Sequence, residues 1–291
     1  MEYLENETLR VGIAAFGAEL TSIVKKSDGT EYVWQGDPAF WKRHAPVLFP
    51  IVGRLKDKEY TLGGQAYTIT QHGFARDLEF TVHRISDTCA EFTLTQNEYT
   101  KAMYPYDFTF TIRYTLDGAT LKKEHITENR STFPLYYEVG GHDAYNILFG
   151  GEALSDYYVA FEGTNTLEVI DVDDAVMLSQ GHHTVPLADG RLYLSREVFA
   201  HDALMLDRLP IRRCTIGCLK HDRKVTMDFS DFPYFAVWSP YQEQDVPFVC
   251  LEPWSSLPDG GYLGKALEEK VGVRTVAPGK AETLAFSVTI A

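Results

Sequence analysis

The sequence predicts an all-β protein, a large antiparallel β-sandwich with a few short helices. Turn signals such as Gly63-Gly64 and Asp117-Gly118 recur along the 291 residues, and alternating or β-branched runs flank them. Helical patterns are scarce and short. Aromatic residues make up 13% of the chain, which suits sheets because flat rings pack well on pleated surfaces. Since no linker or tandem repeat divides the sequence, we expect one domain over residues 1–291.

The individual elements follow from these turns and from local helix signals. Four β-turns are expected, a hairpin at Gly63-Gly64, a hairpin at Asp117-Gly118, a turn at Asp189-Gly190 and a closing hairpin over 273–290 at Pro278-Gly279. Three short helices are expected over 37–41 with Asp37 as N-cap, over 97–104 before Pro105, and over 262–271 with one apolar stripe.

Composition excludes several classes of function. The net charge of −14, without any run of Lys or Arg, argues against nucleic-acid binding. No stretch approaches the roughly 18 apolar residues of a membrane span, and the acidic N-terminal segment resembles no secretion signal. We therefore expect a cytoplasmic protein whose four cysteines stay reduced. No phosphate-binding glycine loop, nucleophile elbow or metal-ligand spacing is present, so neither a cofactor nor a metal is expected.

Glu252 follows the apolar run 246–251 and precedes Pro253 and Trp254. We expect a buried strand that Pro253 terminates, with the carboxylate partly desolvated beside the indole. Desolvation raises a carboxyl pKa and makes the carboxylate a better base near neutral pH. The alternative is a glutamate on the solvent side of a strand end.

His142 follows the pair Gly140-Gly141, which lets the backbone turn tightly or approach a ligand closely. An imidazole there can serve as a general acid at neutral pH. The alternative is a loop histidine that is hydrogen-bonded to the backbone. Glu252 and His142 are our candidate catalytic residues.

Candidate ligand-binding residues come from other turns. His72 and Arg76 share the segment 71–77, and Arg54 follows Gly53. Arginine forks suit vicinal hydroxyls or a phosphate, whereas salt bridges with nearby carboxylates are the simpler explanation for both arginines. A sugar ring could stack on any of four tryptophans, Trp34, Trp41, Trp238 and Trp254, with core packing as the alternative for all four. We favour Trp238 and Trp254, because they lie at the ends of expected strands. An aspartate before an apolar run, Asp202, is a further candidate ligand, and Asp207 five residues later competes for this role.

Arg54, His72, His142 and Glu252, in this order on a β-rich chain, resemble the aldose 1-epimerase (galactose mutarotase-like) family, in particular its branch related to LacX. The resemblance extends from the segment 9–20 to the C-terminal strands. It implies the large sandwich of that family, a sugar as the small-molecule partner, and interconversion of α and β anomers without a cofactor. It also implies that Glu252 is the base, that His142 is the acid, and that His72, Arg54 and Asp202 bind the sugar.

The run His72-Gly73-Phe74-Ala75-Arg76 departs from the classical mutarotase pattern and looks like that of the hexose-6-phosphate epimerases. Arg54 and Arg76 are then a candidate phosphate clamp, against the overall negative charge. Two other classes remain open, a sugar-binding protein that has lost the reaction, and a glycoside hydrolase or lyase with Asp202 or Asp143 as a second carboxylate. A homodimer is compatible with the sequence but is not indicated by it.

Overall fold

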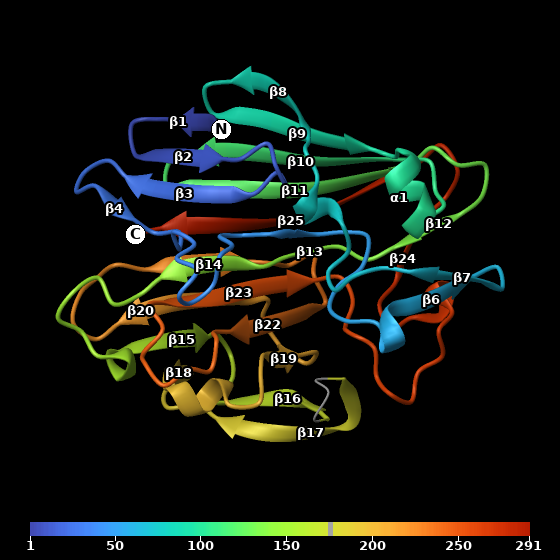
Figure 1. The fold of residues 1–291 in the computed structure, drawn as a ribbon. Coiled ribbons are helices and arrows are strands. Elements are labelled where there is room, and N and C mark those ends of the chain that lie inside the picture. Colours follow the sequence, from blue (N-terminus) through green and yellow to red (C-terminus); the bar gives the residue numbers. More distant parts are fainter. Residues whose placement is uncertain (174–176) are drawn as a thin grey trace.

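The computed structural model describes residues 1–173 and 177–291, and most of its strands belong to two large antiparallel sheets (Figure 1). The first sheet has nine strands in the order β18 (Arg191–Tyr193), β15 (Tyr157–Phe161), β20 (Arg213–Cys218), β21 (Val225–Asp228), β25 (Ala281–Ile290), β11 (Thr120–Asn129), β10 (Phe108–Asp117), β9 (Cys89–Thr95) and β8 (Thr81–Ser86). The second sheet has eight, in the order β17 (Leu178–Pro186), β16 (Thr166–Val172), β19 (Leu204–Leu206), β22 (Tyr234–Trp238), β23 (Phe248–Trp254), β13 (Gly140–Gly141) and β5 (Val47–Leu48), with β14 (Asp143–Asn146) also paired to β23.

Smaller elements complete the architecture. A four-stranded sheet contains β1 (Glu2–Glu5), β2 (Leu9–Ile13), β3 (Leu20–Lys25) and β4 (Thr30–Glu31). Two strand pairs are β6 (Glu59–Leu62) with β7 (Gln65–Thr68), and β12 (Leu135–Tyr137) with β24 (Arg274–Val276). The helices are α1 (Glu98–Met103) and short 3-10 turns at Lys56–Lys58, Ala75–Asp77, Leu154–Asp156, Arg196–Phe199 and Leu267–Glu269. The predicted all-β fold class is confirmed.

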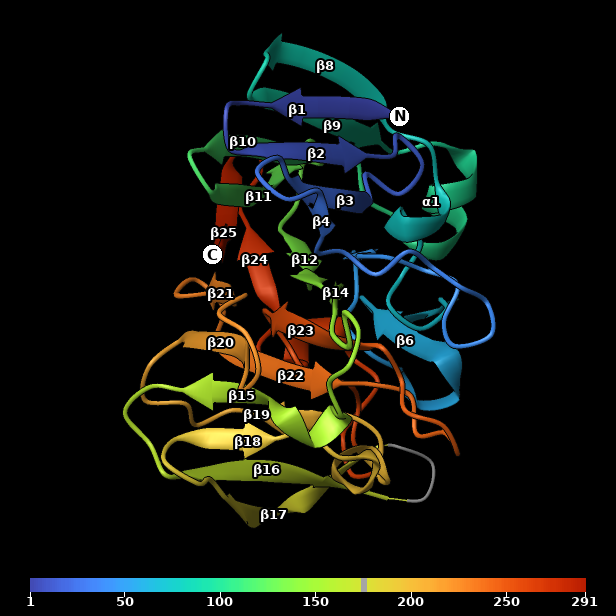
Figure 2. The ribbon, with the colours of Figure 1, turned by 90° about the vertical axis from the view of Figure 1, so that its left-hand side faces the viewer.

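The main core lies between the nine-stranded sheet and the elements that cover it. Period-2 burial places Phe110, Ile112 and Tyr114 of β10 in this core, together with Val249 and Leu251 of β23. The rings of Phe49 and Phe110 stack with centroids 4.0 Å apart. Figure 2 shows β11, β25 and β20 of the large sheet on the left and β6 on the right. Because Val249 and Leu251 of β23 belong to the main core, the other face of the eight-stranded sheet is turned away from the large sheet.

Local sequence signals predicted several elements correctly. The hairpins at Gly63-Gly64 and Asp117-Gly118 form as expected, and the helix predicted over 97–104 is α1. Asn97 caps it through a reciprocal capping box with Thr100, which satisfies backbone N–H groups at its start. The segment 37–41, where a short helix was expected, forms only a turn, in which the Asp37 side chain accepts a hydrogen bond from the Ala39 N–H. At Asp189-Gly190 the chain turns as expected, into β18.

Two predicted elements are wrong. The segment 262–271 has only one 3-10 turn, because the Thr61 N–H donates to the Lys265 carbonyl and holds this segment extended beside β6. The closing hairpin does not form either. The chain turns at Gly279, but β24 pairs with β12 while β25 pairs with β11 and β21. Pairing with strands that are distant in sequence therefore overrides both local signals. Within the described residues, no helix has the length and apolar character needed to cross a membrane.

A buried histidine in the main core gives the fold a pH-dependent stability. His125 of β11 is 0% exposed among aromatic rings that include Phe232 and Phe286, and neither of its nitrogens has a hydrogen-bond partner among the described residues. Burial, together with the Lys123 charge, holds the pKa of His125 well below its usual value. The ring is therefore neutral in the folded protein, whereas in the unfolded chain it takes up a proton below about pH 6.5.

The unfolded state then binds more protons than the folded state, so stability falls as the pH drops below about 6.5. Below pH 6.5 the neutral His125 costs the wild type up to ~1.4 kcal/mol of unfolding free energy per pH unit, and Phe has no such cost. We therefore expect the stability advantage of His125→Phe over the wild type to grow by about 1 kcal/mol between pH 6 and pH 5. Urea unfolding at several pH values measures this difference. Parallel pH profiles for the two proteins would contradict it.

Candidate active site

Glu252 lies in β23 on the outer face of the eight-stranded sheet. The side chains of Val249 and Leu251 point into the main core, so those of Cys250, Glu252 and Trp254 point to the opposite face. Contrary to expectation, Pro253 does not end the strand, because β23 continues to Trp254 and Pro253 pairs with Phe235 of β22. Glu252 is 1% exposed, so the predicted burial of this carboxyl group is found, within the strand rather than at its end.

His142 lies directly opposite Glu252 on the neighbouring strand. The register joins Gly140 to Trp254 and Asp143 to Leu251, and its continuation between these pairs sets His142 against Glu252. Cross-strand neighbours have Cβ atoms about 4.5–5.5 Å apart, close enough for their side chains to meet. Nε2 of His142 is 3.2 Å from Oε2 of Glu252.

The electrostatic environment favours the neutral form of each group. Burial, with the negative charges of Asp202 and Asp143, raises the pKa of Glu252 well above its usual value. Burial and the charge of Arg76 lower the pKa of His142 to about 3. Both shifts favour the uncharged pair, a carboxylic acid beside a neutral imidazole, over the ion pair. The two groups titrate as a unit rather than separately.

His72 approaches His142 from a loop on the other side, with ring centroids 5.6 Å apart. Its backbone has a left-handed φ of 65°, which is uncommon for a non-glycine residue. The next residue, Gly73, also has a positive φ, and a Cβ there would lie 2.2 Å from the Phe49 carbonyl oxygen. Only glycine fits at that position. The backbone N–H of Gly53 donates to Nδ1 of His72 at 3.1 Å.

Arg54 and Arg76 meet at Gln71. Nε of Arg54 donates to the Gln71 side-chain oxygen at 3.2 Å, and a terminal nitrogen of Arg76 donates to the Gln71 carbonyl at 2.6 Å. Arg76 also lies 3.8 Å from Asp77, so the predicted salt bridge exists alongside the placement at the cavity. Arg43 forms a shorter bridge to Asp77 at 2.8 Å, which adds a third guanidinium to this side of the site.

Asp202 and the tryptophans form the remaining walls. Asp202 has a left-handed φ of 78°, and one carboxylate oxygen accepts a hydrogen bond from the Ala203 N–H at 2.9 Å. Asp207 does not line the cavity and instead contacts Nε2 of His182 at 3.1 Å. Trp238 and Trp254 line the cavity, as does Trp41, whose indole stacks on the His142 ring with centroids 4.9 Å apart.

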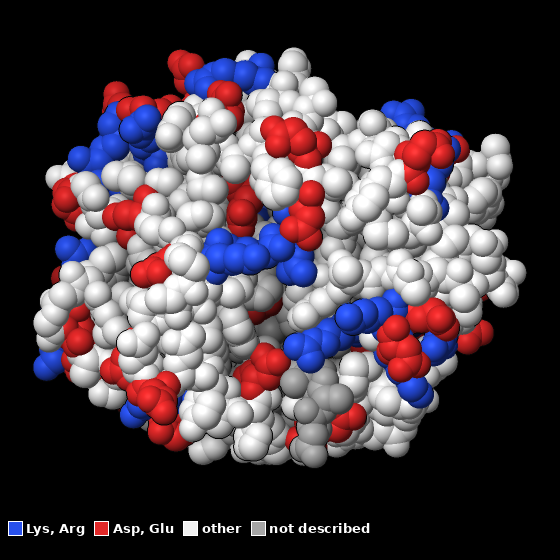
Figure 3. All heavy atoms as spheres, viewed as in Figure 1, with Lys and Arg blue, Asp and Glu red and all other residues white. Residues whose placement is uncertain are grey.

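These side chains surround one cavity of about 310 Å³. Figure 3 shows this face of the molecule, where Lys and Arg side chains flank a hollow near the centre and acidic groups border it. Four buried polar atoms without a hydrogen-bond partner among the described residues belong to its walls, namely Glu252 Oε1, His142 Nδ1, Arg76 Nε and Trp254 Nε1. Buried polar atoms are normally hydrogen-bonded, so this concentration indicates a site for a polar ligand.

The structure brings all eight predicted site residues to this cavity, Arg54, His72, Arg76, His142, Asp202, Trp238, Glu252 and Trp254. Other wall residues include Gln71 and Trp41. Gln71 was not proposed as a ligand, although it precedes His72 in the same motif. Trp41 was considered as a sugar platform but was not chosen, and its segment joins the site through tertiary packing. Asp143, considered as a second carboxylate, is buried away from the cavity and pairs with Lys123 at 3.1 Å.

One group of side chains in the described part of the chain has donor atoms spaced for a metal ion. His142, Cys250 and Glu252 each offer an atom within 4.8 Å of the others. Burial raises the pKa of the Cys250 thiol well above its usual value, which keeps it protonated. Because metals bind the thiolate, this set fits a metal poorly.

Comparison with known proteins agrees with this geometry. A family model described as aldose 1-epimerase matches residues 3–266. The chromosomal LacX protein of Lactococcus lactis subsp. lactis is 33% identical over 300 residues, which cover 99% of this chain and 98% of LacX. A galactose mutarotase related enzyme from Lactobacillus acidophilus is 34% identical with a TM-score of 0.94, covering 100% of this chain and 97% of that chain. A galactose mutarotase-like protein from Lactobacillus casei is 33% identical with a TM-score of 0.92, covering 100% of both chains. The chain thus belongs to the aldose 1-epimerase family, whose fold it shares.

Proposed function

We propose that this protein is an aldose 1-epimerase that interconverts the α and β anomers of a hexose by general acid–base ring opening. The observation that carries the proposal is the pairing of Glu252 with His142 across two strands, 3.2 Å apart, in the wall of a cavity with polar and aromatic sides. A base and an acid side by side suit a reaction that removes one proton from a substrate and adds another nearby.

In the proposed reaction, the sugar binds against the pair, with its C1 hydroxyl towards Glu252 and its ring oxygen towards His142. Glu252 takes the hydroxyl proton, the C1–O5 bond breaks as C1=O forms, and O5 receives the proton of His142. Rotation about C1–C2 exposes the other aldehyde face, and the same steps in reverse close the ring. The reactive form, a carboxylate with an imidazolium, has the same single proton as the neutral pair, so binding requires no change of net charge.

Other wall residues supply binding and stabilisation. The Gly53 N–H donates to Nδ1 of His72, so a neutral His72 ring has its proton on Nε2, where it can donate to a sugar oxygen. Oδ1 of Asp202 accepts a hydrogen bond from the Ala203 N–H, and a carboxylate has further lone pairs for sugar hydroxyls. Trp41, Trp238 and Trp254 offer aromatic surface to the apolar faces of a pyranose. Removing any one of these three indoles should raise KM for the sugar more than it lowers kcat.

A hexose 6-phosphate is the second candidate substrate, and the arrangement of Arg54 and Arg76 on either side of Gln71 favours it. Guanidinium groups bind phosphate in a bidentate manner and more strongly than neutral donors do. Their position at the cavity, not the net charge of −14, decides the local field that an anionic ligand meets.

Arg76→Ala is expected to raise KM for glucose 6-phosphate at least tenfold, which corresponds to about 1.4 kcal/mol of binding. KM for galactose should change less than twofold, because a free hexose presents no phosphate. For Arg76→Lys, KM for glucose 6-phosphate should lie between those of the wild type and Arg76→Ala. The matched control is Arg196→Ala, which removes an exposed arginine that pairs with Asp245. If the KM values for both sugars rise equally, the phosphate clamp is excluded.

The proposed function is tested by exchange NMR of the two anomers of galactose, glucose and glucose 6-phosphate, with and without protein. Accelerated exchange for at least one sugar is expected. If saturation transfer shows that the sugars bind but none exchanges faster than in buffer, the protein is a sugar-binding protein and not an epimerase. Release of reducing sugar from an oligosaccharide would instead indicate a glycosidase.

A further inference from the structure

A buried ionic network lies behind the cavity, outside the groups that the mechanism uses. Nζ of Lys270 contacts Asp259 Oδ1 and lies 3.9 Å from Glu138 Oε1, and all three side chains are at most 3% exposed. The Ser256 hydroxyl lies 2.8 Å from Glu138 and 2.6 Å from the Val271 carbonyl. Buried ion pairs contribute little net stability, because desolvation offsets their attraction. The arrangement of this ionic network therefore calls for an explanation other than stability.

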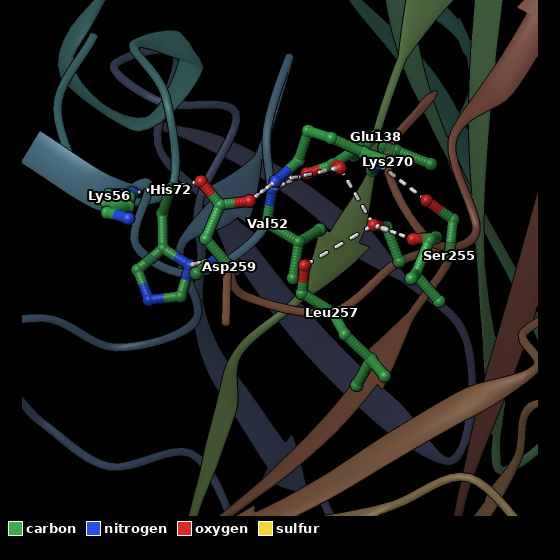
Figure 4. Close-up of polar contacts among 12 residues, drawn as sticks. Val52, Lys56, His72, Glu138, Ser255, Leu257, Asp259 and Lys270 are labelled. Atoms are coloured by element: carbon green, nitrogen blue, oxygen red, sulfur yellow. Dashed lines mark hydrogen bonds and ion pairs between the residues drawn. The ribbon is translucent and has the colours of Figure 1, made fainter. Parts of the chain in front are cut away.

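The two carboxylates hold the backbone of one loop, as Figure 4 shows. Glu138 Oε2 accepts from the Val52 N–H at 2.8 Å, and Asp259 Oδ2 accepts from the Lys56 N–H at 2.9 Å. Between these points, the Asp259 N–H donates to the Arg54 carbonyl at 2.9 Å. The loop 52–56 is thus fixed at its start, middle and end.

Gly53, inside this loop, controls the orientation of His72. Its N–H donates to Nδ1 of His72, and its carbonyl accepts from the His72 N–H at 2.9 Å. The Gln71 side-chain nitrogen lies 3.2 Å from Nε2. That amide can turn its oxygen towards a protonated Nε2 by giving up the hydrogen bond from Arg54, whereas the backbone N–H of Gly53 can only donate. Gly53 therefore decides which His72 nitrogen carries the proton.

The same network joins the segments that carry the proposed acid and base. Glu138 lies four residues before His142 on the chain, and its N–H donates to the Pro50 carbonyl at 2.8 Å. Ser255, three residues after Glu252, exchanges hydrogen bonds with Val139, through its hydroxyl at 2.8 Å and its N–H at 2.9 Å.

We infer that Glu138, Asp259 and Lys270 are positioning residues that hold the loop 52–56, and through Gly53 keep the His72 proton on Nε2, facing the sugar. This inference rests on the proposed function, since it assigns a purpose to the placement of His72. None of the three residues touches the substrate, so they act through the loop and not on the reacting atoms.

The test compares Glu138→Gln with Glu138→Met. The Gln amide oxygen keeps an acceptor for the Val52 N–H, whereas Met has a similar size and no acceptor there. We expect kcat to fall at least tenfold in Glu138→Met and less than threefold in Glu138→Gln. Imidazole nitrogen NMR should show His72 protonated on Nε2 in the wild type and in Glu138→Gln, and a mixture of tautomers in Glu138→Met. Leu192→Ala, a buried residue of β18 outside the cavity, controls for lost stability alone.

A folded Glu138→Met protein with unchanged kcat and an unchanged His72 tautomer would overturn the inference and leave the network purely structural. If Glu138→Met does not fold, Asp259→Leu and Asp259→Asn give the same comparison, because only Asn keeps an acceptor for the Lys56 N–H. We expect a threefold to tenfold fall in kcat with a shifted His72 spectrum in Asp259→Leu but not in Asp259→Asn, and an unchanged spectrum in Asp259→Leu would again overturn the inference. The NMR readout needs no turnover, so failure of the proposed epimerase activity is detected separately, by the absence of anomer exchange in the wild type.

Discussion

Glu252→Gln is expected to lower kcat for anomer exchange by about 10³-fold, within the 10²–10⁴ range of a general acid or base. The amide has nearly the same shape as the carboxyl group and still occupies the wall of the cavity opposite His142, but it cannot accept the C1 hydroxyl proton. KM should change little, because the other wall residues remain. Exchange NMR at saturating sugar measures the effect. Full activity in a folded variant would show that Glu252 is not the base.

The same substitution should stabilise the fold. The raised pKa of Glu252 means that the folded state keeps a proton which the unfolded chain loses above about pH 4.5, so the wild type loses stability as the pH rises. Gln has no such proton, and the advantage of Glu252→Gln in urea unfolding should therefore be larger at pH 8 than at pH 5. An inactive and more stable variant is the signature of a group that is retained for chemistry at the expense of stability.

His142→Gln is expected to lower kcat by 10²–10³-fold, because the departing ring oxygen then lacks its proton donor. The matched control is His182→Gln, which removes another histidine that contacts a carboxylate, Asp207, outside the described site. That variant should retain activity within twofold. Equal losses in both variants would indicate a general effect on stability rather than a role for His142 in the reaction.

The wild-type pH profile should carry the mark of the same pair. Because the pKa of His142 is lowered to about 3, the pair takes up a second proton only far below neutral pH. We therefore expect kcat to hold steady as the pH falls from 7 to 5. A decline centred near pH 6.5 would mean that an ordinary histidine titrates, in conflict with the buried pair.

The sequence was most informative where the signal is local. The apolar run before Glu252 and the glycine pair before His142 are visible in the residues themselves, and they led to the candidate base and acid. The cross-strand register that sets His142 against Glu252 is not visible, because it depends on which strands pair. The same limit explains the errors at 262–271 and at the closing hairpin, where distant partners decided the conformation.

Long-range contacts also define the part of the site that sequence reasoning could not place. Trp41 was one of four tryptophans considered as a sugar platform, but no local pattern predicts its stacking on His142, about 100 positions away in the chain. Glu138, Lys270 and Asp259 look like ordinary surface charges in the sequence and become interpretable only once they are found buried together. The choice between Asp202 and Asp207 as the candidate ligand also needed the structure, because only Asp202 lines the cavity.

The most direct test of the central claim is the exchange rate between the α and β anomers of galactose, glucose and glucose 6-phosphate, measured by NMR with wild type and with Glu252→Gln. The account predicts that the wild type accelerates exchange of at least one of these sugars and that Glu252→Gln, still folded and still binding that sugar, loses about 10³-fold of that acceleration. Acceleration that survives in Glu252→Gln, or its absence in a wild-type protein that binds these sugars, would contradict it.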